Sequence, residues 1–305
     1  MTTELNESKK LGNPMISIII HILPHEIDQL EQTLIGLKKC STRTNKEYLV
    51  EVVLNCNLTN WEESTLPQRF FVDKLRDLEN LTKSWAEVNF YADFDNKILG
   101  CTDPRRNCTQ YDTEATIWLD VDIIFSDTIL AHLESAIDGM EKDYYVITPE
   151  ITKLWDDSWD VITNEKSLKN YVKPERYFDR DPYISSGLKG EVYLKPINTF
   201  KWGGGWFTCI SSKLVEKIKL PKEIGHYALD DTFLMVCYKN LKRLGLLDIT
   251  QYVMVNEVII ENNLFRFNPY KDYLNNIDKR EEYKKIASDN FQPCVEKTLR
   301  KFTTK

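Results

Sequence analysis

Short β-branched runs alternate with amphipathic helical stretches through the first 150 residues of the chain. The run Met15–Leu23 is too long and too apolar for an edge strand, which favours a central strand of a mostly parallel sheet. Four further runs of strand composition follow, at 48–54, 88–91, 115–119 and 144–148. Helical faces lie between them, except that an irregular segment through Gly100 and Pro104 precedes the run at 115–119, and Ser126 is predicted to cap the last helix. The alternation predicts a three-layer α/β fold whose ligand lies at the carboxyl ends of its strands.

The second half follows a different pattern. Residues 152–200 are rich in Trp, Tyr, Asp, Lys and Pro without sustained periodicity, which predicts a long functional loop that closes over substrates. Strand composition returns at 206–210 and 253–260, and a helix is predicted directly after Asp230. The charged residues from Asp278 onward predict one or two surface helices.

Composition and motifs exclude several classes of function. A 42% hydrophobic share with a net charge of −7 indicates a folded protein without a global field for nucleic acid or an anionic membrane. Seven cysteines without a C-x-x-C pair disfavour a disulfide framework or a zinc cluster and predict reduced thiols. The common nucleotide and hydrolase motifs are absent. Neither a signal peptide nor a membrane-spanning run is visible, so a cytoplasmic protein without a transmembrane segment is predicted.

Two carboxylates follow the apolar run at 115–119. Asp120 and Asp122 are two residues apart, so they face the same side of an extended chain. Hard oxygen ligands of this kind suit Mg²⁺ or Mn²⁺, which keeps its other positions for water and a diphosphate. A solvated turn is the alternative for so common a pattern, and its position in an α/β chain favours the metal.

A second acidic pair, Asp230 and Asp231, opens a predicted helix. A carboxylate within hydrogen-bond reach of a hydroxyl can accept its proton as a new bond forms. The alternative is that one aspartate caps the helix, and with two adjacent acids one can cap while the other faces the cleft. The glycines at 203–205 permit close backbone approach to a ligand, and the flanking Trp202 and Trp206 are either a sugar platform or core residues.

Taken in order, these motifs resemble those of GT-A glycosyltransferases, particularly the family 2-like ones. The resemblance covers about residues 14–262. It rests on the joint order and rough spacing of Ile16-Ser-Ile-Ile-Ile, Arg105-Arg-Asn107, Leu119-Asp-Val-Asp122, Gly203-Gly-Gly-Trp206 and Leu229-Asp-Asp-Thr-Phe233. It implies a GT-A (Rossmann-like) three-layer sandwich with a mostly parallel central sheet.

The resemblance also implies a division of the chain and a role for each motif. A disordered tail at 1–13 would precede a catalytic domain at 14–262 and a C-terminal helical extension at 263–305. Within the domain, 14–150 would bind the nucleotide sugar and 151–262 would form the acceptor side. Asp122 would hold the metal, Asp120 would contact the ribose or the metal, and Asp231, with Asp230 beside it, would be the catalytic base. The other implied donor-binding residues are Pro24, Asn55, Arg106, Asn107, Gly204, Gly205 and Trp206.

The chain departs from the family pattern in three ways. The second strand ends at Asn55 where the family usually has an acidic residue, which leaves the donor nucleotide open. The acidic pair is Asp-Asp where Glu-Asp is more usual. No late histidine completes the metal site, so one or two protein ligands are expected.

The sequence therefore predicts a metal-dependent glycosyltransferase that moves a sugar from a nucleotide-diphosphate donor to a hydroxyl acceptor, with inversion and with Mn²⁺ or Mg²⁺ as cofactor. The acceptor stays open among a glycan, a lipid-linked sugar, a protein and a modified nucleobase. A nucleotidyltransferase is one alternative, although it would be expected to carry a Gly-rich, basic loop after the first strand. A non-catalytic nucleotide-sugar-binding protein is the other.

Overall fold

Strand β1 (Met15–Ile22) lies inside the sheet, as its composition predicts. It pairs in parallel with β2 (Glu47–Asn55) on one side and with β4 (Ala115–Leu119) on the other. The parallel strand β3 (Glu87–Asp93) pairs with β2. Ile18 points to one face and Ile19 to the other, and they are 0% and 2% exposed. The run is apolar except at Ser17 and His21, because both faces of the sheet are covered.

The computed structural model describes residues 15–56, 68–95, 97–107, 112–121, 123–154, 190–197, 207–262 and 280–303. Within them the sheet order is β3-β2-β1-β4-β8-β6-β9-β5, and β7 pairs with β9 beside this path. The remaining strands are β5 (Ile123–Phe125), β6 (Tyr144–Leu154), β7 (Tyr193–Ile197), β8 (Phe207–Ser211) and β9 (Ile249–Asn262). Strands β5, β7 and β8 run against the other six, so the mostly parallel sheet is confirmed.

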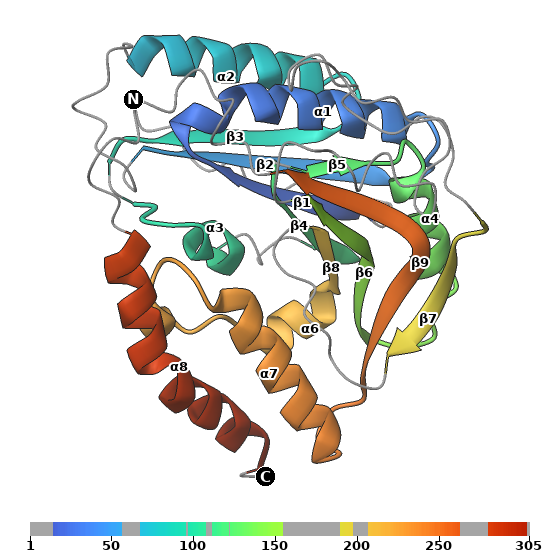
Figure 1. Ribbon diagram of the computed structural model, residues 1–305, viewed down its shortest axis with the longest axis vertical. Helices are drawn as coiled ribbons and strands as arrows, with labels where there is room; N and C mark the ends of the chain where they lie inside the picture. Colours follow the sequence, from blue (N-terminus) through green and yellow to red (C-terminus); the bar gives the residue numbers. More distant parts are fainter. Residues whose placement is uncertain are drawn as a thin grey trace.

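Helices cover both faces of this sheet (Figure 1). One face carries α1 (Ile27–Ser41), α2 (Gln68–Thr82) and α4 (Ile129–Asp138). The other carries α6 (Ser212–Lys217), α7 (Asp230–Arg243) and α8 (Arg280–Thr303). Each face has its own hydrophobic cluster, to which β1 contributes alternate side chains. The predicted three-layer α/β fold is confirmed.

Within the described ranges, three short helices connect these elements: η1 (Pro24–Glu26), α3 (Thr102–Asn107) and η4 (Lys222–Ile224). The sequence predicted an irregular segment where α3 lies. It also predicted an irregular segment at 152–200, whereas β6 continues to Leu154 and β7 occupies part of it. The rest of the predicted substrate-closing loop, at 155–189 and 198–200, lies outside the described residues.

The predicted cap of α4 is wrong. The N-cap position belongs to Thr128, and the Ser126 hydroxyl is instead bonded to the carboxylate of Glu257 and to the hydroxyl of Thr128. A partner more than a hundred residues away in the sequence therefore takes the side chain that a local rule assigns to the helix.

Thiols and helix hydropathy complete the description. The six cysteines in the described ranges are all free, as predicted. No helix within those ranges is long and apolar enough to cross a membrane. The predicted tail at 1–13 lies outside the described residues. The division into a domain at 14–262 and an extension at 263–305 stays a prediction, as does the cytoplasmic location.

Candidate active site

The carboxyl ends of three parallel strands meet at one edge of the sheet. Ile20 of β1 is level with Leu119 of β4, and Ile22 is level with Leu54 of β2. The residues at or just after the ends of these strands therefore lie together, and they include the predicted Pro24, Asn55 and Asp120. This edge is where α/β sheets bind ligands.

Asn55 and Pro24 are buried at this edge. The Asn55 Nδ2 lies 3.2 Å from His21 Nε2, so the amide donates to the ring nitrogen. Burial, and then the charge of Arg105, lowers the pKa of His21 to about 3, which keeps the imidazole neutral and able to accept this bond. The donor-binding roles of Asn55 and Pro24 stay predictions.

Arg105 joins the two acidic motifs, and the sequence reasoning missed it. Its Nη1 donates to Asp230 Oδ2 at 3.0 Å and its Nη2 donates to Asp120 Oδ1 at 3.2 Å. The guanidinium carbon also lies 5.0 Å from the centre of the Trp118 ring. Arg105 is only 8% exposed, and a buried guanidinium is tolerated when carboxylates and an aromatic face surround it.

Arg106 was the predicted donor-binding arginine, and its contacts are different. Its guanidinium donates to Asp103 Oδ1 at 2.8 Å and to three backbone carbonyls, those of Leu220, Pro221 and Gly225. These bonds fasten α3 to the loop that leads toward α7. Asn107, the last residue of α3, is exposed. A donor contact for either residue stays a prediction.

Asp230 and Asp231 are the first two residues of α7, and neither occupies the N-cap position, which is that of Leu229. Asp230 is 2% exposed and is held by Arg105. Asp231 Oδ1 accepts from the backbone N–H of Thr232 at 2.8 Å. Burial, followed by the negative charge of Asp230, raises the pKa of Asp231 to about 7. One aspartate is therefore fixed in an ion pair while its neighbour exchanges a proton near neutral pH.

The backbone that leads into this acidic pair is strained. Ala228 and Leu229 have φ angles of 70° and 59°, in the left-handed region that side chains with a Cβ disfavour. Each such residue costs on the order of 1–3 kcal/mol and persists only where the surroundings hold it. Strain of this kind clusters at functional sites, so the observation favours a role for the turn before Asp230.

The fit of a metal ion depends on the acidic residues after β4. Burial raises the pKa of Asp120, and Arg105 opposes that rise. The Asp120 side chain keeps 36% of its surface exposed, so a ligand can still reach it. No group of three or more His, Cys, Asp or Glu side chains in the described ranges is placed to hold a metal. The expected site with one or two protein ligands stays a prediction, because Asp122 lies outside the described residues.

Four predicted site residues lie outside the described residues. They are Asp122, Gly204, Gly205 and Trp206. Their roles in binding a metal or a donor therefore stay predictions.

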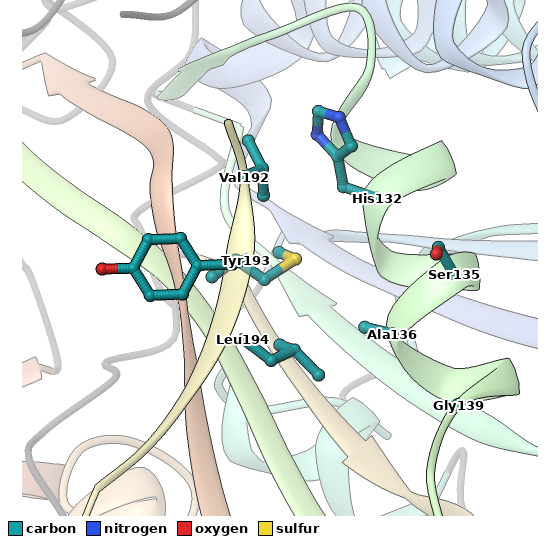
Figure 2. A pocket seen from close by; sticks show the side chains of 8 residues that line it. His132, Ser135, Ala136, Gly139, Val192, Tyr193 and Leu194 are labelled. Atoms are coloured by element: carbon teal, nitrogen blue, oxygen red, sulfur yellow. The ribbon is translucent and has the colours of Figure 1, made fainter. Parts of the chain in front are cut away.

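A separate cleft of about 260 Å³ opens between α4 and β7. His132 and Ser135 project from α4 toward Val192 and Leu194, while Tyr193 points away (Figure 2). The Nδ1 of His132 is held by the fully buried Glu257. This cleft shares no described lining residue with the carboxyl-end site.

Comparisons with known proteins find similarity only in shape. No protein-family model matches the chain, and no curated protein matches it. Similar solved structures include S. aureus TarS 1–349 (15% identity, 90% of this chain, 70% of that chain, TM-score 0.48). Others are the mannosyltransferase PcManGT from Pyrobaculum calidifontis in complex with GDP-Man and Mn²⁺ (12%, 97%, 78%, 0.48) and GalNAc-T7 with UDP, GalNAc and Mn²⁺ (13%, 96%, 58%, 0.49). At these identities and TM-scores we transfer no residue role from them.

Proposed function

We propose that the chain is a glycosyltransferase that moves a sugar from a nucleotide-diphosphate donor to a hydroxyl acceptor with inversion. The observation that carries the proposal is Asp231, whose pKa of about 7 suits a general base at neutral pH. It lies beside the ion-paired Asp230 at the carboxyl-end edge of the sheet, where α/β folds bind ligands.

Asp231 would act on the acceptor. Its carboxylate accepts the proton of the acceptor hydroxyl while the oxygen attacks the anomeric carbon and the nucleoside diphosphate departs. Arg105 holds Asp230 in place, and after burial the negative charge of Asp230 contributes to the raised pKa of Asp231. A single displacement of this kind inverts the anomeric centre.

Arg105 would fix the distance between the two halves of the site. It ties Asp120, after β4, to Asp230, at the start of α7. A divalent ion held by Asp122, with Asp120 beside it, would supply positive charge for the departing diphosphate. We propose Pro24, Asn55, Arg106, Asn107, Gly204, Gly205 and Trp206 as the remaining donor-binding residues.

The test is release of nucleoside diphosphate by the full chain from a panel of nucleotide sugars, with Mn²⁺, with Mg²⁺ and with EDTA. We expect one donor to be used, the metal to be required, and Asp231→Asn to lower kcat by about 10²- to 10⁴-fold. Asp248→Asn, at an exposed residue paired with Lys142, is the control and should be unchanged.

Other outcomes identify the alternatives. Donor binding without release or transfer indicates a binding protein, and pyrophosphate formed from a nucleoside triphosphate and a sugar phosphate indicates a nucleotidyltransferase. An Asp231→Asn variant with wild-type kcat removes the base assignment. Product with the same anomeric configuration as the donor removes the inverting mechanism.

A further inference from the structure

The loop that leads from η4 to α7 is fastened to α3 on one side. The Nδ1 of His226 lies 2.9 Å from Asp103 Oδ1, and the His226 carbonyl accepts from the backbone N–H of Thr102 at 3.1 Å. Asp103 also accepts from Arg106. A Cβ added to Gly100 would lie 2.1 Å from the His226 oxygen, so the two backbones are in closest contact here.

Helix α8 covers the other side of the same loop (Figure 1). The Tyr283 ring, 8% exposed, packs edge to face on His226 with ring centres 5.5 Å apart. It also forms a small apolar cluster with Leu23, against which Leu99 and Tyr227 pack. Further along α8, the side chain of Ile286 lies against Gly225.

A second contact joins α8 to η4, the element that precedes the loop. Lys297 Nζ donates to Glu223 Oε1 at 2.6 Å, between α8 and η4. The ring contact and this ion pair are separated by about four turns of α8, since 14 residues rise about 21 Å. The helix therefore contacts η4 at Glu223 as well as the loop at Gly225 and His226.

His226 lies two residues before the left-handed Ala228 and Leu229, and these lead directly into Asp230 and Asp231. A strained turn relaxes unless its flanks are held. Tyr283 holds one side of His226 and Asp103 the other. We propose that α8 clamps this turn and that Tyr283 is a positioning residue for Asp231, acting through His226. The proposal deepens the proposed function, since it rests on Asp231 as the base.

Loosening the turn should change how Asp231 titrates. Among the described residues, the charged and titratable groups around it are Asp230, Arg105, Asp120 and Cys101. None of these is on α8, so loss of the Tyr283 ring leaves the local charges in place. Loss of the ring acts by letting water reach the Asp231 carboxylate, and better solvation favours its charged form. The pKa of Asp231 should therefore fall.

Tyr283→Leu is the test variant, because leucine keeps an apolar side chain against Leu23 while removing the ring from His226. Tyr283→Phe restores the ring and should rescue the effect. Lys284→Ala is the matched control, since Lys284 is the next residue, is exposed and pairs only with Glu281 within the described residues. All are made in the full chain, and a variant that loses its cooperative thermal transition is replaced by His226→Gln, which removes the same contact.

Two measurements decide the proposal without activity. In Tyr283→Leu we expect amide hydrogen exchange at 226–232 to be about tenfold faster or more. Carboxyl-carbon NMR should show the Asp231 pKa falling from about 7 toward the ordinary value of about 3.9. With an active donor pair, kcat should fall about 10- to 100-fold while the donor KM stays within about twofold.

The outcomes separate the two proposals. Exchange and titration equal to those of Lys284→Ala, with only a lower Tm, would mean that Tyr283 merely packs, which overturns the clamp. A wild-type chain that transfers no sugar removes the proposed function, yet the exchange and titration arms still decide whether α8 positions Asp231. Faster amide exchange with an unchanged Asp231 pKa also overturns the clamp, because loosening the turn then does not alter the surroundings of the Asp231 carboxylate.

Discussion

Asp231→Asn should stabilise the fold at neutral and alkaline pH while removing activity. Burial and the charge of Asp230 raise the Asp231 pKa from 3.8 to about 7 in the folded chain, whereas the unfolded chain loses this proton at about 3.9. Between these values the folded state binds a proton that the unfolded state does not. This contribution to stability is complete below about pH 4 and is lost as the pH rises through about 7. Asparagine does not ionise, so the Asp231→Asn chain does not lose this stability as the pH rises.

The size of the effect follows from the two pKa values. Moving from 3.8 to about 7 corresponds to at most about 4 kcal/mol, at about 1.36 kcal/mol per pH unit. Asp231 retains some exposure, and solvent screening reduces this to about 2 kcal/mol. A chain of 305 residues gains about 0.6 kcal/mol/K of unfolding entropy, so the Tm should rise by about 3 °C at pH 8.

Calorimetry of the wild type and Asp231→Asn at pH 4, 6 and 8 measures this directly. The difference in Tm should be near zero at pH 4 and largest at pH 8. Asp248→Asn is the control of opposite sign, because the side chain of Lys142 lowers the pKa of Asp248. An Asp231→Asn chain that melts below the wild type at pH 8, or a difference independent of pH, would refute the reasoning.

Three further predictions concern the same edge of the sheet. Arg105→Met should lower the free energy of unfolding by about 3–5 kcal/mol in urea titrations, because Asp230 is left buried and unpaired; a loss below about 1 kcal/mol contradicts this. Gly100→Ala should lower the Tm far more than Gly139→Ala, since the added Cβ would lie 2.1 Å from a backbone oxygen in the first and 3.5 Å in the second. Asp122→Ala should abolish turnover with an unchanged Tm, and full activity in EDTA would contradict a metal.

The elements that the sequence predicted correctly have a period that the sheet or helix itself imposes. β1 is mostly apolar on both sides because helices cover both faces, and α1 buries Ile27, Leu30, Leu34 and Leu37 at helical spacing. Helix α3 was not predicted, because its six residues are too few to show a helical period. Its place is set by Asp103 and Arg106, which bond to residues more than a hundred positions away. No local pattern reports such partners.

The acidic motifs could be found from the sequence, but Arg105, which joins them, was quoted only as part of a motif and was given no role. Successive helical residues point about 100° apart, so Arg105 and Arg106 face different surroundings. Arg105 faces the two acidic motifs, and Arg106 faces the carbonyls that precede α7. A short segment with two adjacent arginines gives no sign of which one turns inward.

The balance of charge between the two acidic motifs also points to an arginine between them. Asp120 and Asp230 lie at one edge of the sheet, and neighbouring carboxylates repel each other unless a cation lies between them. Lysine offers a single point of charge, whereas a guanidinium presents separate N–H groups to two acceptors. The required cation is therefore an arginine within reach of both motifs, on a segment anchored near the sheet edge. The Arg105–Arg106 pair is the segment that meets this condition in the structure, and Arg105 is the member that donates to both carboxylates.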